Sequence, residues 1–276
     1  VVLGAGPLQS RIQAGVSSTA TASTADPLLS AQADAEAAGL KALASSTLTG
    51  SLSSAKVALV VLPGASDDDV TAIRSTLTDA GASVIGRVTL TDNWQSTSMS
   101  QYRTTLSTTL ASHLASGAAK TASADGVVGY SIVQVLTTTG AETDLLRQIL
   151  TDESTPIMTV DEDANGGATA IVAVGPRAQA TAVSNATPAA ATHSSDAWVG
   201  LGQALGSTNG VLVGDASTRD AMISQVRASG VTVTTVDSVG TTLAAVDTAL
   251  ALSTPATGAR AFGVGNGAQS VIPSNK

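Results

Sequence analysis

Residues 57–62, Val-Ala-Leu-Val-Val-Leu, form a continuous apolar run with the length of one β-strand. A strand that is apolar at every position is buried on both faces, which is typical of a parallel sheet covered by helices. Pro63-Gly64 ends the run, and Ser66 stands at a helix N-cap position before a helical apolar stripe that ends at Gly81. Residues 83–90 then return as a strand. The pattern predicts a β-α-β unit with a right-handed crossover.

The same order of elements recurs near the C-terminus. A strand at 211–214 is followed by a helix carrying Met222 and Val226, and then by a strand at 231–236. Weak identity between the two copies favours the common pattern of β-α-β units over a duplication. Further apolar patterns predict helices at 102–114, 145–150 and 198–205, and strands at 156–160 and 169–174. We therefore expect an α/β fold, with a largely parallel sheet or sheets flanked by helices.

Residues 1–54 differ in composition from the rest of the chain. The opening Val1–Pro7 is apolar and does not begin with Met, which predicts the outer end of a membrane anchor; a strand start or a frayed terminus is the alternative. A Ser/Thr/Ala-rich linker follows, and then an Ala-rich helix that begins after Asp26 and stops near Gly50. This helix is either a coiled-coil stalk or a helix laid on its own domain.

We expect the α/β domain to occupy residues 55–276. The acidic, glycine-containing stretch at 161–168 marks a candidate boundary inside it, and residues 175–195 form a long loop. Two α/β lobes, or one sheet with a long excursion, fit this pattern equally.

Composition excludes several classes of function. The chain has no cysteine, two histidines, 12% charged residues and a net charge of −8. Nucleic-acid binding depends on clustered Lys and Arg, so an acidic chain with scattered basic residues is not expected to bind it. Soft metals need thiolate, thioether or imidazole ligands, and no two of His113, His193 and the three methionines stand at helical ligand spacing. The absence of cysteine favours an oxidising, extracytoplasmic compartment.

Three polar segments have the residue types of metal, catalytic or phosphate-binding sites, but each also has a purely structural interpretation. Asp67-Asp68-Asp69 is favoured electrostatically in the first turn of a helix. Asp161-Glu162-Asp163 has no His, Lys or Tyr close in sequence and is interpreted as a solvated loop. The glycine-rich 263–267 has the composition of a phosphate-binding loop, but no helix follows it. We therefore expect no enzyme activity, no metal site and no cofactor.

Four segments resemble the actinobacterial MctB/SteB family across nearly the whole chain. They are Val1–Leu8, the block Val60–Val70 with its three aspartates, Ala80–Val84, and the tail from Phe262 to Val271. The resemblance implies an N-terminal membrane anchor, a coiled-coil stalk and an extracytoplasmic α/β domain. It also implies two different functions. One is copper transport in the outer envelope, and the other is a SteB-type role with SteA in control of a septal peptidoglycan hydrolase of the RipA type.

Of these functions, we expect the second. The protein would be a membrane-anchored homodimer on the extracytoplasmic (periplasmic) side of the cell envelope, binding a SteA-type membrane partner and the coiled coil of a RipA-type hydrolase. The polar segment Asp92–Arg103 is the candidate contact surface, because Trp94 and Tyr102 stand out in it and aromatic side chains are common binding hot spots. The alternative is that Tyr102 begins a core stripe and that Trp94 packs over it.

Overall fold

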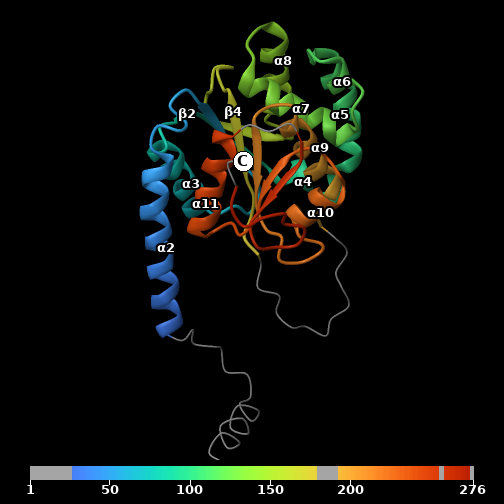
Figure 1. Ribbon diagram of the computed structural model, residues 1–276. Helices are drawn as coiled ribbons and strands as arrows, with labels where there is room; N and C mark the ends of the chain where they lie inside the picture. The colour runs from blue at the N-terminus through green and yellow to red at the C-terminus, as the bar shows by residue number, and fades with distance from the viewer. Residues whose placement is uncertain (1–26, 179–191, 255–257, 274–276) are drawn as a thin grey trace, which may run out of the picture. The chain divides into compact units, whose positions relative to one another are not determined.

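The computed structural model describes residues 27–178, 192–254 and 258–273 and confirms the α/β fold (Figure 1). Seven strands form one sheet in the order β3-β2-β1-β4-β5-β6-β7, and every neighbouring pair is parallel except β2 and β3. The strands are β1 (Lys56–Val61), β2 (Ser83–Leu90), β3 (Met158–Glu162), β4 (Ala170–Val174), β5 (Gly210–Val213), β6 (Thr234–Val236) and β7 (Arg260–Phe262). Of the two arrangements left open by the sequence, the structure has the single sheet.

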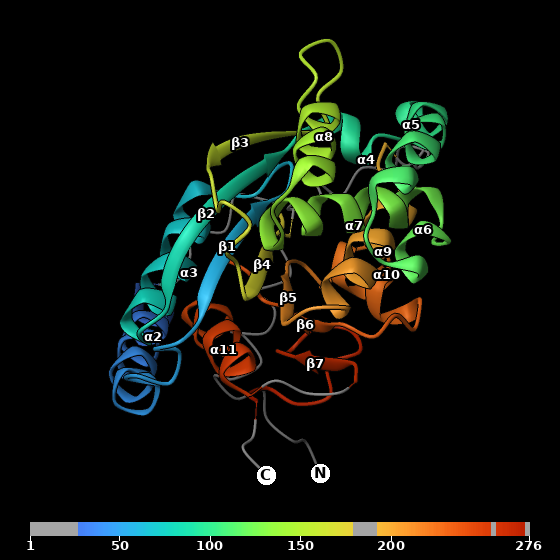
Figure 2. The ribbon, with the colours of Figure 1, turned by 90° about the horizontal axis from the view of Figure 1, so that it is seen from above.

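Helices cover both faces of this sheet (Figure 2). One face carries α3 (Asp67–Asp79), α11 (Thr242–Ser253) and the end of α2 (Pro27–Leu48). The other carries the remaining helices, which are α4 (Asp92–Gln95), the 3₁₀ turn η1 (Thr97–Met99), α5 (Ser100–His113), α6 (Gly117–Lys120), α7 (Ala124–Thr137), α8 (Ala141–Leu150), α9 (Ser195–Gly206) and α10 (Met222–Ala228).

The two hydrophobic cores follow from the alternation of side chains along β1. Val57, Leu59 and Val61 belong to the core under α3 and α11. Ala58 and Val60 point the other way, into the core under the longer set of helices. Since successive residues of a strand face opposite sides of a sheet, a strand between two helical layers must be apolar throughout. The continuous apolar run in the sequence therefore correctly predicted a doubly covered strand.

The strand order reverses between β1 and β4. From β1 the chain passes outward to β2 and β3, and it then returns to the other side of β1 as β4. In open α/β sheets this reversal leaves a crevice at the carboxyl ends of the strands, where ligands commonly bind. The loops that start at Pro63, Gly175, Gly214 and Asp237 all leave the sheet at this edge.

Helix α7 was not predicted from the sequence. Ten of its fourteen residues are buried, so its sequence has no polar face and shows no amphipathic period. Gly129 allows α7 to approach α9 closely, since a Cβ atom at this position would lie 2.7 Å from the carbonyl oxygen of Gly200. A helix buried on nearly all sides looks like generic apolar sequence, which explains the omission.

The predicted N-terminal region lies partly within the described residues. Residues 1–26, including Asp26 and the expected anchor end, lie outside the described residues. The predicted helix is present as α2 and ends before Gly50, which has a φ of 75°. Contacts divide the chain into a unit up to Gly39 and a compact unit from Leu40 to Lys276. Among the described residues, no helix combines the length and the apolarity needed to cross a membrane.

Candidate functional site

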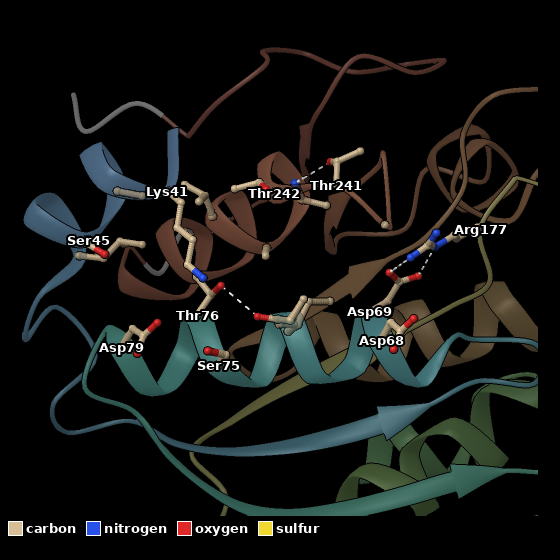
Figure 3. Close-up of a pocket in the computed structure, with 18 residues that line it drawn as sticks. Lys41, Ser45, Asp68, Asp69, Ser75, Thr76, Asp79, Arg177, Thr241 and Thr242 are labelled. Carbon is tan, nitrogen blue, oxygen red and sulfur yellow. Dashed lines mark hydrogen bonds and ion pairs between the residues drawn. The ribbon is translucent and has the colours of Figure 1, made fainter. Parts of the chain in front are cut away.

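A cleft of about 300 Å³ lies in the compact unit between α3, α11 and the C-terminal end of α2 (Figure 3). Its apolar lining includes Ala44, Leu48, Ile73, Ala245 and Val246. These side chains come from all three helices, so the cleft exists only because α2 packs beside the β-α-β unit. Asp69 and Arg177, which follow β1 and β4, place one end of the cleft near the point where the strand order reverses.

Charged side chains rim this cleft. Lys41 extends from α2 toward Thr76 of α3 (Figure 3), and no ion pair involves it within the described part of the chain. Asp68 and Asp79 lie at opposite ends of α3 on the cleft side. Besides the ion-paired Asp69 and Arg177, the cleft therefore combines an apolar floor with the cation of Lys41 and the separated carboxylates of Asp68 and Asp79, an arrangement suited to an amphipathic ligand.

The end of the cleft nearest the strand reversal is closed by an ion pair between Asp69 and Arg177. Arg177 follows β4 and donates from Nε and Nη2 to the two carboxylate oxygens of Asp69, at 2.8 and 2.7 Å. Asp69 is 3% exposed, and its hydrogen bonds and charge raise the pKa of Arg177. Gly240 leaves room for the guanidinium, since a Cβ there would lie 2.6 Å from Nε.

The Asp67-Asp68-Asp69 motif thus has two roles. Its three carboxylates lie in the first turn of α3, as the sequence predicted. Ser66 occupies the N-cap position, but its side chain makes no capping hydrogen bond, which corrects the expected cap. Asp67 pairs with Arg87 at 3.1 Å, and Asp69 pairs with Arg177. The motif therefore ties α3 to β2 and to the loop after β4.

The glycine-rich loop 263–267 wraps around a carboxylate of the chain itself. Asp237, at the end of β6, accepts hydrogen bonds from the backbone amides of Val264 (2.8 Å) and Gly265 (3.0 Å). It also accepts from Arg227 Nη1 at 2.9 Å. Burial raises the pKa of Asp237, but the hydrogen bonds from Ser238, the two amides and Arg227 outweigh it, so its pKa lies below the usual range. The amides that could have held a phosphate are already occupied.

The predicted contact surface around Trp94 requires correction. Trp94 is 0% exposed and packs in the core under the longer set of helices, so this structure does not offer it to a partner. Tyr102 is half-buried against the same core and donates to the carbonyl of Thr155 at 3.3 Å. The alternative interpretation, a core role for both aromatic side chains, is the one that fits.

The acidic stretch Asp161–Asp163 is not a solvated loop, which corrects a second expectation. Asp161 and Glu162 belong to β3. Arg74 binds Glu162 through two hydrogen bonds of 2.7 and 2.6 Å, which lower the pKa of that carboxyl. Arg87 pairs with Asp161, and Arg147 pairs with Asp163. These carboxylates attach the antiparallel edge strand to its neighbours.

The candidate soft-metal ligands lie on separate elements. His113 Nδ1 contacts Glu142 Oε2 at 2.5 Å, and the ring of His193 lies 6.3 Å from that of Trp198. Met158 and Met222 are buried in the core, as expected. In the described ranges, no three His, Cys, Asp or Glu side chains form a group that could hold a metal ion.

The family model described as "Copper transport outer membrane protein, MctB" matches residues 1–273, which is nearly the whole chain. No curated protein matches.

Proposed function

The chain belongs to the MctB family, and from that premise we propose that it is a non-enzymatic envelope protein that binds partner proteins to control a septal peptidoglycan hydrolase in cell division. In this proposal an N-terminal membrane anchor holds the protein on the extracytoplasmic side. The protein pairs with a second copy and with a SteA-type membrane partner. It acts by docking the coiled coil of a RipA-type hydrolase.

The observation that carries the proposal is the chemistry of the three-helix cleft. An apolar floor between helices, with charges at its rim, suits an amphipathic helix that buries an apolar stripe. Asp68 and Asp79 are eleven residues apart on α3, which corresponds to about 16 Å or three helical turns at 1.5 Å per residue. A helix lying along α3 would complement this rim with basic side chains three turns apart and with an acidic side chain facing Lys41.

Two matched variants of α3 test this docking. Ala72 lines the cleft, whereas the neighbouring Thr71 is exposed and does not line it. Ala72→Arg fills the cleft and is expected to weaken binding of the hydrolase coiled coil at least about tenfold, a loss of roughly 1.4 kcal/mol. Thr71→Arg adds the same charge beside the cleft and should leave the affinity unchanged. Equal affinities for both variants in calorimetric titration would rule out the cleft as the docking site.

Copper transport or homeostasis is the second candidate, favoured by the description of the family. Titration of the full chain with Cu(I) and Cu(II), run beside light scattering, separates the two functions. Tight stoichiometric uptake would support copper transport. A doubled mass without uptake, together with binding of the coiled coil, would support the protein-binding role.

A further inference from the structure

Asp247 is a buried carboxyl group on α11 for which the described structure supplies no partner. The residue is 0% exposed, and neither carboxylate oxygen has a hydrogen-bond partner among the described residues. Buried polar groups are nearly always hydrogen-bonded, because an unpaired one loses its hydration without compensation. An ionised carboxylate in such a place would be far more costly than a neutral one. The surroundings of Asp247 therefore favour the protonated, neutral form of its carboxyl group.

The groups around Asp247 reinforce this preference. Helix α11 packs on α3, β5 and β6. The inward residues of α3 are Val70, Ile73 and Leu77, and β5 has no titratable residue. At the end of β6 stands Asp237, whose negative charge acts on Asp247.

The nearby cations have other partners. Arg227 binds Asp237, and the amides of the glycine loop also hold that carboxylate in its ionised form. Arg260, on β7, donates from Nη2 to the carbonyl of Ala251 at 2.8 Å and from Nε to Thr234. Asp69, at the start of α3, is paired with Arg177. Asp247 thus faces a fixed negative charge, and none of these arginines neutralises it.

We propose that Asp247 is a proton-binding site that couples the packing of α11, and with it one wall of the cleft, to pH. With the proton bound, the carboxyl is neutral and α11 stays packed on the sheet. When the proton leaves, the carboxylate favours states in which α11 loosens and water reaches the side chain. This inference concerns the fold and does not depend on the proposed function.

The direction of the pH dependence follows from linkage. Burial, and secondarily the charge of Asp237, raise the pKa of Asp247 from 3.8 to about 7. The folded state therefore holds a proton that the unfolded state releases above about pH 4. The stabilisation of the folded state by this proton is fully present below about pH 4 and is lost as the pH rises. Above about pH 7 the free energy of unfolding changes little further with the titration of Asp247. Between pH 5 and pH 8 this one group should raise the unfolding equilibrium constant on the order of a hundredfold.

Urea unfolding of the full chain from pH 5 to pH 8 measures this effect. Asp247→Asn keeps the shape of the side chain but cannot ionise, so it should remove the hundredfold change and be more stable than the wild type at pH 8. Asp144→Asn, at an exposed position on α8, is the matched control and should follow the wild-type curve. Parallel curves for the wild type and Asp247→Asn would overturn the proposal.

A measurement on the wild-type protein keeps the proposal testable if the variant does not fold. The carboxyl carbon of Asp247, followed by ¹³C NMR in aspartate-labelled protein, should titrate near neutral pH. Amide hydrogen exchange in α11, corrected for intrinsic rates, should accelerate over the same range. Titration of Asp247 below pH 5 would refute the assignment.

Discussion

Arg103 lies completely buried beside Asp125, and its Nε donates to Asp125 Oδ1 at 2.5 Å. Its Nη1 donates to the carbonyl oxygens of Asn93 and Ser96, at 3.2 and 2.7 Å. One guanidinium therefore joins α5 to the start of α7 and to the segment that carries Trp94. This contact ties the short helices α4 and η1 to the core.

Arg103→Met is expected to destabilise the protein by about 3–5 kcal/mol, because it leaves Asp125 with a mostly buried and unpaired charge. The measurement is the free energy of unfolding in urea. Adding Asp125→Leu should recover part of the loss, since both charges are then absent. A double variant no more stable than Arg103→Met would show that the backbone contacts, and not the ion pair, dominate.

Trp94→Ala should cost about 3–5 kcal/mol, as expected for a large aromatic side chain removed from a packed core. The chain has two tryptophans, so Trp198→Phe isolates the fluorescence of Trp94. Because Trp94 is buried, that fluorescence should be poorly quenched by acrylamide. Strong quenching would show that Trp94 is exposed, and it would again be a candidate contact residue.

The sequence predicted the strands best where both faces are covered. β1, β4 and β5 lie within one residue of their expected bounds, because a doubly buried strand leaves an uninterrupted apolar run. Single-sided or short strands were less well placed: β6 begins at Thr234 where a strand from 231 was expected, and β3 is shifted toward its acidic end. β2 was placed at its observed bounds although its burial is mixed, whereas β6 is buried but only three residues long, so a short strand gives too few positions to locate its ends.

The candidate site depends on contacts that no local pattern records. Asp69 and Arg177 are 108 residues apart, and Asp237 meets the amide of Val264 across 27 residues. The aspartates and the glycine loop were visible in the sequence, but their partners were not. Each local interpretation, a helix-end charge or a phosphate loop, was therefore incomplete until the sheet brought the partners together.

Gly263→Ala is expected to destabilise the C-terminal loop severely. Gly263 has a φ of 120°, and a Cβ there would overlap the carboxylate of Asp237. Gly258→Ala is the matched control, since Gly258 also has a positive φ, of 140°, but no described residue lies within 4 Å of a Cβ atom there. The control carries only the backbone strain, about 1–3 kcal/mol. Gly263→Ala should lose clearly more stability than Gly258→Ala in thermal unfolding. Equal losses would mean that the loop rearranges to accommodate the methyl group.

Asp237→Asn should make the free energy of unfolding depend less on pH in the acid range. The pKa of Asp237 is lowered in the folded state, so its contribution is present above its ordinary value of 3.8 and is lost as the pH falls through the lower folded value. Urea unfolding between pH 2 and pH 5 should therefore show a steeper loss of stability for the wild type than for the variant.

Asp237→Asn should also be less stable at pH 6, because it leaves the charge of Arg227, 8% exposed, without its counter-ion. An unchanged pH dependence of the variant in the acid range would mean that other carboxylates, such as Glu162 and Asp163, govern acid unfolding.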